Sequence, residues 1–296
     1  MEHRFPEDRG LTARMAITLI LLGAVYAGFI AVMVGLHVLS LAVVVVIALG
    51  LLVAQYWWSD RVALAAMGAR VVSPGEAPEL HAVIDRLCAV ADMDKPRVAL
   101  ARTDLPNAFA TGRSRRAAVL CVTTGLVRRL DTQELEGVLA HELSHIAHRD
   151  VLVMAMAGFL GMVAGIMVRI SIIGRGSGNG YMAMAWGVAM GVALCSYALS
   201  FLLVRVLSRY RELSADRAAA VATARPAALA AALTKVSGEL AAVPSRDLRR
   251  AEPVSALLFA PAAPRASMSR LFAAHPSLER RLRQLQALEA HLGQAS

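Results

Sequence analysis

The chain has 296 residues, of which 57% are hydrophobic, and its mean hydropathy is +0.55. This composition is too apolar for an ordinary soluble domain and indicates a membrane protein. The formal net charge is +9, but no block of basic residues alternates with aromatic ones. We therefore expect no nucleic-acid partner, and we attribute the positive charge to the flanks of membrane spans.

The N-terminal part of the chain carries a long uncharged segment. No charged residue occurs between Arg14 and Asp60, whereas about 20 helical residues suffice to cross the hydrocarbon core of a bilayer. The segment therefore predicts two spans, over residues 16–36 and 39–56, joined by a tight turn. We expect residues 1–58 to form an N-terminal transmembrane hairpin.

Residues 59–150 are more polar and are predicted to form the first part of a catalytic domain. Apolar residues at helical spacing indicate a helix over 79–90, and short apolar or alternating runs indicate strands over 97–101 and 117–122. The three cysteines of the chain form no CxxC pair, so we expect small buried hydrophobic residues rather than metal ligands.

An HExxH motif begins at His141. Asp131 and Glu134 form a predicted capping box that starts the helix, and apolar residues follow at helical spacing. Residues i and i+4 share one face of a helix, so His141 and His145 can bind one Zn²⁺. Glu142 lies further round the helix, where it can act as general base on a zinc-activated water. The alternative is a polar helix whose histidines face solvent.

A second apolar segment occupies residues 151–204. Its two arms, 151–173 and 181–204, are separated by the glycine-rich stretch 174–180, which is typical of a turn. We expect a second transmembrane hairpin here. A buried helical hairpin inside a soluble domain is the alternative.

Residues 205–296 are predicted to form the second part of the catalytic domain. A catalytic zinc usually has three protein ligands and one open position. Glu212 and Asp216 stand four apart on a helix expected to continue the preceding arm. Glu212 can ligate the metal, and Asp216 can hydrogen-bond the outer nitrogen of a ligand histidine. For this segment alone, a solvated acidic pair is the alternative. Further helices are predicted over 226–240 and 278–292.

Basic residues flank the predicted spans on one side. The turn between the first two spans has none, so the positive-inside rule places the N-terminus and the catalytic domain on the cytoplasmic side. Arg175, in the second predicted turn, departs from this rule. The flanking residues are Arg4, Arg9, Arg14, Arg61 and Arg70 at the first hairpin, and Arg149, Arg205 and Arg209 at the second.

Several segments together resemble the HtpX-type membrane zinc metalloproteases, which are HExxH…ExxxD gluzincins related to the CAAX prenyl proteases. Besides the HExxH motif, they comprise residues 107–112, 208–216, 255–259 and 271–276. The predicted four-span layout is similar as well. The resemblance covers most of residues 70–285, and the combination is far more specific than any segment except HExxH.

The resemblance implies a role for each matched residue. The zinc ligands would be His141, His145 and Glu212, with Glu142 as the catalytic base and Asp216 as the acid that follows the third ligand. A short segment would bind the substrate backbone as an added strand, and a His-Pro histidine would act on the oxyanion. These last residues are Asn107, Ala108, Phe109, Ala110 and His275. For residues 107–110, the alternative is a plain turn into a strand. For His275, it is a histidine at the start of a helix. The Thr that usually precedes His-Pro in the family is replaced here by Ala274.

These observations predict a mainly α-helical integral membrane protein with a small β-sheet, about four transmembrane helices and a zincin-like α+β catalytic domain. The predicted function is a zinc-dependent endopeptidase, with one Zn²⁺ per chain, that degrades misfolded or damaged membrane proteins in protein quality control and the stress response. Its partners would be polypeptide substrates and the lipid bilayer of the cell inner membrane. The alternatives are a CAAX-type prenyl protease and an inactive membrane scaffold or chaperone.

Overall fold

The computed structural model of the chain describes residues 8–35, 41–148, 180–242 and 276–295. The chain divides into two compact units. The sheet unit comprises Met1–Arg9, Ser59–Leu152 and Ser208–Ser296, and the helical unit comprises Gly10–Trp58 and Val153–Leu207.

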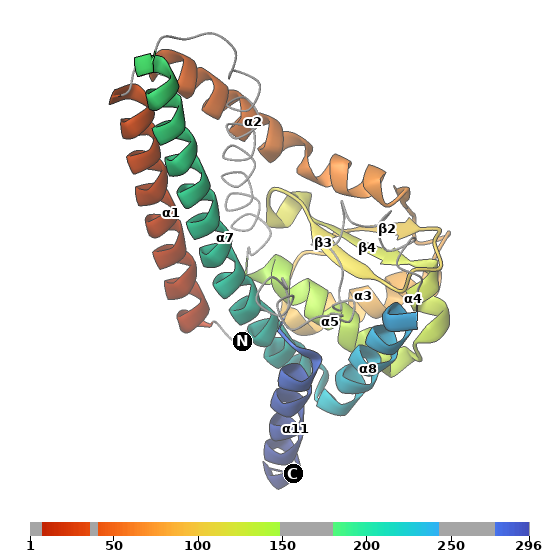
Figure 1. Cartoon of the computed structure of the whole chain (residues 1–296). Coiled ribbons are helices and arrows are strands. Elements are labelled where there is room, and N and C mark those ends of the chain that lie inside the picture. The colour runs from red at the N-terminus through yellow and green to blue at the C-terminus, as the bar shows by residue number, and fades with distance from the viewer. Residues whose placement is uncertain (1–7, 36–40, 149–179, 243–275, 296) are drawn as a thin grey trace. The chain divides into compact units, whose positions relative to one another are not determined.

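The sheet unit is built on a small mixed sheet with the strand order β1-β2-β4-β3 (Figure 1). Strands β2 and β4 are parallel, and each edge strand is antiparallel to its neighbour. Strand β3 pairs with β4 on one side, so its other side is a sheet edge within the described residues. The strands are β1 (Ala69–Val71), β2 (Arg97–Ala101), β3 (Ala108–Thr111) and β4 (Val119–Thr123).

Side chains that alternate along β4 enter two different cores. Leu120 and Val122 join the main core, to which several helices of the sheet unit contribute. Val119 and Cys121 face the other way and pack with Ala63, which lies near the end of helix α2. Besides α1, which is described below, the described residues form a 3₁₀ turn and seven further helices. They are α2 (Leu41–Ala66), α3 (Pro78–Ala91), η1 (Arg115–Ala117), α4 (Thr124–Arg129), α5 (Thr132–Ala147), α7 (Gly180–Thr223), α8 (Pro226–Ala242) and α11 (Leu278–Ala295).

Most of the predicted elements of the sheet unit are confirmed. Helices α3, α8 and α11 and strand β2 occur where the sequence places them. The strand predicted over 117–122 begins later, at Val119, because the preceding residues form η1 with Ser114 as its N-cap. Strand β1 was not predicted, since the strand has only three residues and these are largely exposed. Two cysteines are buried as expected, but Cys195 is exposed, which corrects that expectation.

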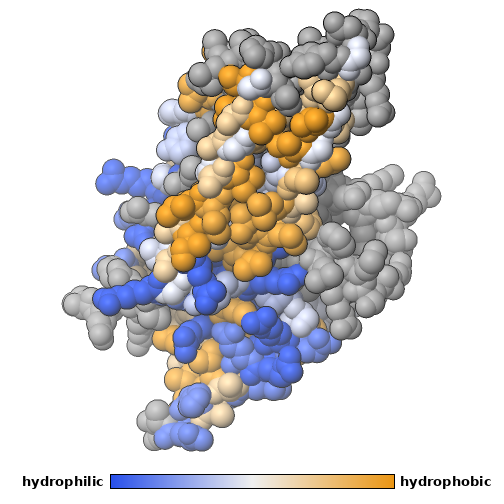
Figure 2. Space-filling view, turned by 60° about the vertical axis from the view of Figure 1, so that its left-hand side comes forward, coloured by the Kyte–Doolittle hydropathy of each residue, from blue (hydrophilic) through white to orange (hydrophobic). Residues whose placement is uncertain are grey.

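The helical unit contains long apolar helices. Two described helices are long and apolar enough to cross a membrane: α1 (Arg9–Gly35) and the Met184–Thr223 part of α7. Both carry exposed large apolar side chains, such as Ile20 and Met184. Figure 2 shows that apolar residues gather on the surface of these long helices. A helix that is apolar all round is buried in a protein core or in lipid.

Within this unit, α1 and α7 pack through Phe29, Met33, Ala189 and Ala193. The small alanines of α7 allow close approach of two apolar helices, as is common in membranes. Helix α7 continues without interruption to Thr223, which confirms that the Glu212 segment extends the predicted arm. The arm predicted over 151–173 and His275 lie outside the described residues, as do residues 174–179 of the glycine-rich stretch and the 255–259 segment of the resemblance.

Candidate metal centre

Helix α5 carries the HExxH motif and is fixed at its start by the predicted capping box. The Asp131 side chain accepts from the backbone N–H groups of Gln133 and Glu134, and the Glu134 carboxylate accepts from the N–H of Asp131. Lys235 of α8 pairs with Glu134 at 2.6 Å. At Gly137 a Cβ would lie 3.3 Å from the Leu229 backbone, so a glycine here allows α8 to approach α5 closely.

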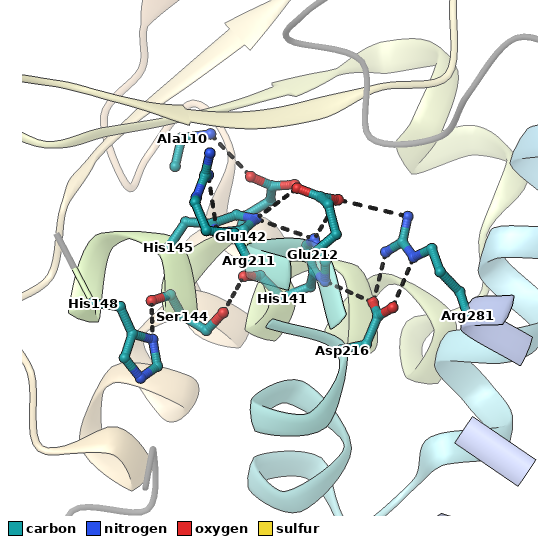
Figure 3. Close-up of polar contacts among 10 residues, drawn as sticks. All are labelled: Ala110, His141, Glu142, Ser144, His145, His148, Arg211, Glu212, Asp216 and Arg281. Atoms are coloured by element: carbon teal, nitrogen blue, oxygen red, sulfur yellow. Dashed lines mark hydrogen bonds and ion pairs between the residues drawn. The ribbon is translucent and has the colours of Figure 1, made fainter. Parts of the chain in front are cut away.

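Three predicted ligands meet in the interior of the sheet unit. His141 and His145 come from α5 and Glu212 comes from α7, and each is about 5% exposed or less. One ligand atom from each residue can be chosen so that all three lie within 4.8 Å of one another. Figure 3 shows the two imidazoles and the carboxylate turned toward one point.

The spacing of these atoms fits a tetrahedral metal. Ligands about 2.0–2.1 Å from a tetrahedral ion lie about 3.3–3.4 Å from each other. The Nε2 atoms of His141 and His145 are 3.3 Å apart, and the Glu212 carboxylate oxygens lie 3.6 Å and 3.5 Å from those two nitrogens. Two imidazole nitrogens and a carboxylate oxygen are ligands that zinc accepts, so these residues fit the ion.

Asp216 lies against the first histidine. Its Oδ1 lies 3.0 Å from Nδ1 of His141, and the aspartate is completely buried. A hydrogen bond donated from Nδ1 leaves the lone pair of Nε2 available to a metal. Burial alone would lower the pKa of His141, but the bonds to Asp216 and Glu212 outweigh it and raise that pKa to about 9. The site therefore stabilises positive charge in the position that a metal would occupy.

Glu142 faces the sheet. It is 5% exposed, and its carboxylate accepts a 3.0 Å hydrogen bond from the backbone N–H of Ala110 in β3. Burial raises the pKa of Glu142 to about 7, against the opposing effect of the charge on His141. A carboxyl group with a pKa near neutrality can both accept and return a proton.

The predicted substrate-binding segment is brought to the site at one end. Ala110 contacts the Glu142 carboxylate, as described above. Asn107 is buried beside Thr123, whose hydroxyl accepts from its N–H and donates to its carbonyl. Phe109 is buried in the smaller core with Val119. Asn107 and Phe109 therefore hold strand β3 in place, and Ala110 reaches the site.

Two arginines of the site were missed by the sequence reasoning. Arg281 of α11 is completely buried and forms two hydrogen bonds with Asp216, of 2.7 Å and 2.6 Å. Arg211, beside the third ligand, has Nη2 at 3.3 Å from Nδ1 of His145. Arg281 interrupts the apolar face of its helix between Leu278 and Leu285. A charged residue on the apolar face of a helix is a sequence signal for a buried, paired charge.

Comparisons relate the chain to a peptidase family and to known proteins. A model of peptidase family M48 matches residues 74–289. The chain is 55% identical to "Protease HtpX homolog 1" of Streptomyces coelicolor, over 100% of this chain and 98% of the relative. It is 47% identical to "Protease HtpX homolog" of Moorella thermoacetica, over 99% of each chain. A crystal structure of S. mikatae Ste24p matches with a TM-score of 0.49 and 16% identity, over 94% of this chain and 66% of that one.

Proposed function

The chain belongs to peptidase family M48 and is a membrane metalloprotease of the HtpX type, and from this premise we propose that it is a zinc-dependent endopeptidase acting on membrane polypeptides. The observation that carries the proposal is the buried group of His141, His145 and Glu212, with atoms spaced as zinc ligands are. The intact ligand set and Glu142 also argue against an inactive scaffold.

His141, His145 and Glu212 would hold the ion, and Asp216 would fix the tautomer of His141. An ion held there would supply Lewis-acid chemistry, which polarises a scissile carbonyl and makes water more acidic. Three protein ligands are the number typical of a catalytic rather than a structural zinc site.

Glu142 would act as the general base. Its carboxylate takes a proton from the attacking water and later gives that proton to the leaving amine. The hydrogen bond from the Ala110 N–H holds the carboxylate in one orientation, and burial raises its pKa above the ordinary range of a carboxyl group. His275, outside the described residues, is proposed as a further group that stabilises the oxyanion.

The substrate would bind in an extended form. Strand β3 is an edge strand of the described sheet, and its Ala110 lies beside the catalytic base. A peptide can add to such an edge through backbone hydrogen bonds, which requires little of its sequence but demands that it be unfolded. Residues 107–110 are therefore proposed as the substrate-binding segment, which favours misfolded or damaged chains.

We further propose four transmembrane helices in the cell inner membrane, with the catalytic domain in the cytoplasm. The two apolar helices α1 and α7 support membrane insertion, and the basic residues that flank the predicted spans support the orientation. Membrane proteins that are damaged or misfolded would then be the substrates, in protein quality control and the stress response.

The test uses the full chain in proteoliposomes containing an unfolded membrane protein as substrate. Wild-type protein should bind one zinc per chain and cleave the substrate, and Glu142→Gln should bind zinc without cleaving. His148→Gln is the matched control, because His148 is the C-cap residue of the same helix and lies outside the metal group. A prenylated C-terminal peptide cleaved in preference to the unfolded protein would instead support a CAAX-type protease. Equal zinc content in a His141→Ala/His145→Ala variant would contradict the ligand set.

A further inference from the structure

Arg281 is a large, fully buried side chain that the reaction described above does not use. It stands on α11, the C-terminal helix, whereas the proposed ligands stand on α5 and α7. Leu285, one turn further along α11, is also buried in the main core. A buried arginine is tolerated only when its charge is paired. The partners of Arg281 therefore indicate the role of this residue.

The partners of Arg281 are the acids of the metal centre. Nε donates to Oδ2 of Asp216 at 2.7 Å and Nη2 donates to Oδ1 at 2.6 Å, which is a bidentate fork. Nη1 lies 3.8 Å from Oε2 of Glu212. Figure 3 shows the guanidinium on the side of Asp216 that faces away from His141. Arg281 thus contacts one proposed ligand directly and another through Asp216.

The same helix makes a second contact with this stretch of α7. The side-chain amide of Gln284 donates to the backbone carbonyl of Leu213 at 2.7 Å, and Leu213 directly follows the proposed ligand Glu212. Gln284 and Arg281 are three residues apart, so both lie on one face of α11. This face therefore fixes the position of the α7 segment that carries Glu212 and Asp216.

Two physical effects of Arg281 on metal affinity have opposite signs. A guanidinium near the centre repels a divalent cation, so its charge alone would weaken binding. Its fork, however, holds Asp216 in the position from which it orients His141, and this favours binding. The fork is bidentate and completely buried, whereas the contact with Glu212 is a single one at 3.8 Å, so the geometry indicates that orientation outweighs repulsion.

We propose that Arg281 is a positioning residue of the metal centre, so that docking of α11 and occupancy of the centre are thermodynamically coupled. Zinc binding then stabilises the docked helix, and the docked helix raises zinc affinity by the same factor. The proposal rests on the proposed function, because it takes His141, His145 and Glu212 as the zinc ligands.

The first test measures zinc affinity by competition with a chelator, using the full chain in detergent. Arg281→Lys keeps the charge but cannot form the fork, and Arg281→Met removes both. Each should weaken zinc binding by about 10–100-fold, which is the usual effect of losing a residue that supports a ligand. Arg283→Met is the matched control, because Arg283 is exposed on the same helix, and it should leave the affinity unchanged.

Charge repulsion and the orientation of Asp216 predict different changes in zinc affinity among the Arg281 variants. Unchanged affinity in Arg281→Lys together with tighter binding in Arg281→Met would mean that charge repulsion dominates, and it would overturn the proposal. Wild-type protein that takes up no zinc would overturn the proposed function and the coupling together. If the wild type binds zinc and both Arg281 variants bind it equally tightly, the coupling alone would be overturned.

The second test needs no variant and so does not depend on variants that fold. Amide hydrogen exchange of the wild-type chain is compared with zinc and after its removal by a chelator. Slower exchange in α11 with zinc bound is expected, together with slower exchange in α5 and α7. Protection of α5 and α7 by zinc, with α11 unchanged, would show that the helix is not coupled to the centre.

Discussion

Replacing Glu142 with glutamine should have opposite effects on activity and on the stability of the metal-free protein. The substitution keeps the size of the side chain and an oxygen that can accept the Ala110 N–H bond, but the amide cannot take up a proton. A positioned general base contributes about 10²–10⁴-fold to the rate, so cleavage should fall by that factor, or by about 3–5 kcal/mol of activation free energy. Zinc content should not change, because Glu142 is outside the ligand group.

The stability effect follows from the cost of burying the Glu142 carboxylate. Burial raises the pKa of Glu142 from 4.5 to about 7 in the folded protein. A carboxyl group whose pKa is raised on folding loses stability for the folded state as pH rises from the unfolded pKa through the folded one. At 1.36 kcal/mol per pKa unit, this cost amounts to about 3 kcal/mol above pH 7. Glu142→Gln removes the ionisation and should therefore stabilise the metal-free chain at pH 8, but not at pH 4.

The assay combines cleavage of an unfolded substrate with thermal unfolding of chelator-treated protein in detergent at the two pH values. Leu143→Met is a suitable control, since it changes a neighbouring buried side chain without changing charge. Near-wild-type cleavage by Glu142→Gln would show that another group is the base. A lower melting temperature than wild type at pH 8 would refute the argument from burial.

Three other predictions concern the ligands, the helix start and the topology. Glu212→Ala should lose zinc and activity together while His148→Gln keeps both, as measured by metal analysis, and a zinc-loaded Glu212→Ala chain would remove Glu212 from the ligand set. Asp131→Ala should reduce the free energy of unfolding by about 1 kcal/mol through loss of the N-cap, seen as a lower melting temperature with unchanged zinc content; an unchanged melting temperature would contradict it. In a chain without native cysteines, a cysteine at the exposed Gln133 should react with an impermeant thiol reagent only after the cells are opened, and labelling in intact cells would reverse the proposed orientation.

The grouping of His141, His145 and Glu212 could be predicted because much of its pattern is local. His141 and His145 are one turn apart, and so are Glu212 and Asp216, so a helical spacing alone places each pair on one face. The capping box at Asp131 is equally local and is confirmed in full. The long α7 helix is consistent with its sequence, since the chain from Val192 to Thr223 contains neither glycine nor proline.

The remainder of the site depends on packing between distant segments. Arg281 is 65 residues from Asp216, and no spacing rule relates two residues on different helices. The Ala110–Glu142 bond joins a strand and a helix that are 32 residues apart, so that only the folded sheet unit brings them together. The register of β3 against β4, which leaves Ala110 near α5, is likewise a property of the sheet rather than of either strand.

The charges of the site favour the proposed divalent cation. Among the residues of Figure 3, three carboxylates (Glu142, Glu212 and Asp216) face two guanidiniums (Arg211 and Arg281) in a buried space. Buried charges are tolerated when they are paired, and this group has one negative charge in excess when Glu142 is ionised. Without metal, the excess raises the pKa of His141 through Asp216 and Glu212, so that a proton supplies the missing charge. A divalent ion that displaces this proton changes the net charge by only one, and it satisfies the converging nitrogens that a proton can bridge only in part. The same carboxylates that are costly to bury without a counter-charge therefore favour a cation at this position.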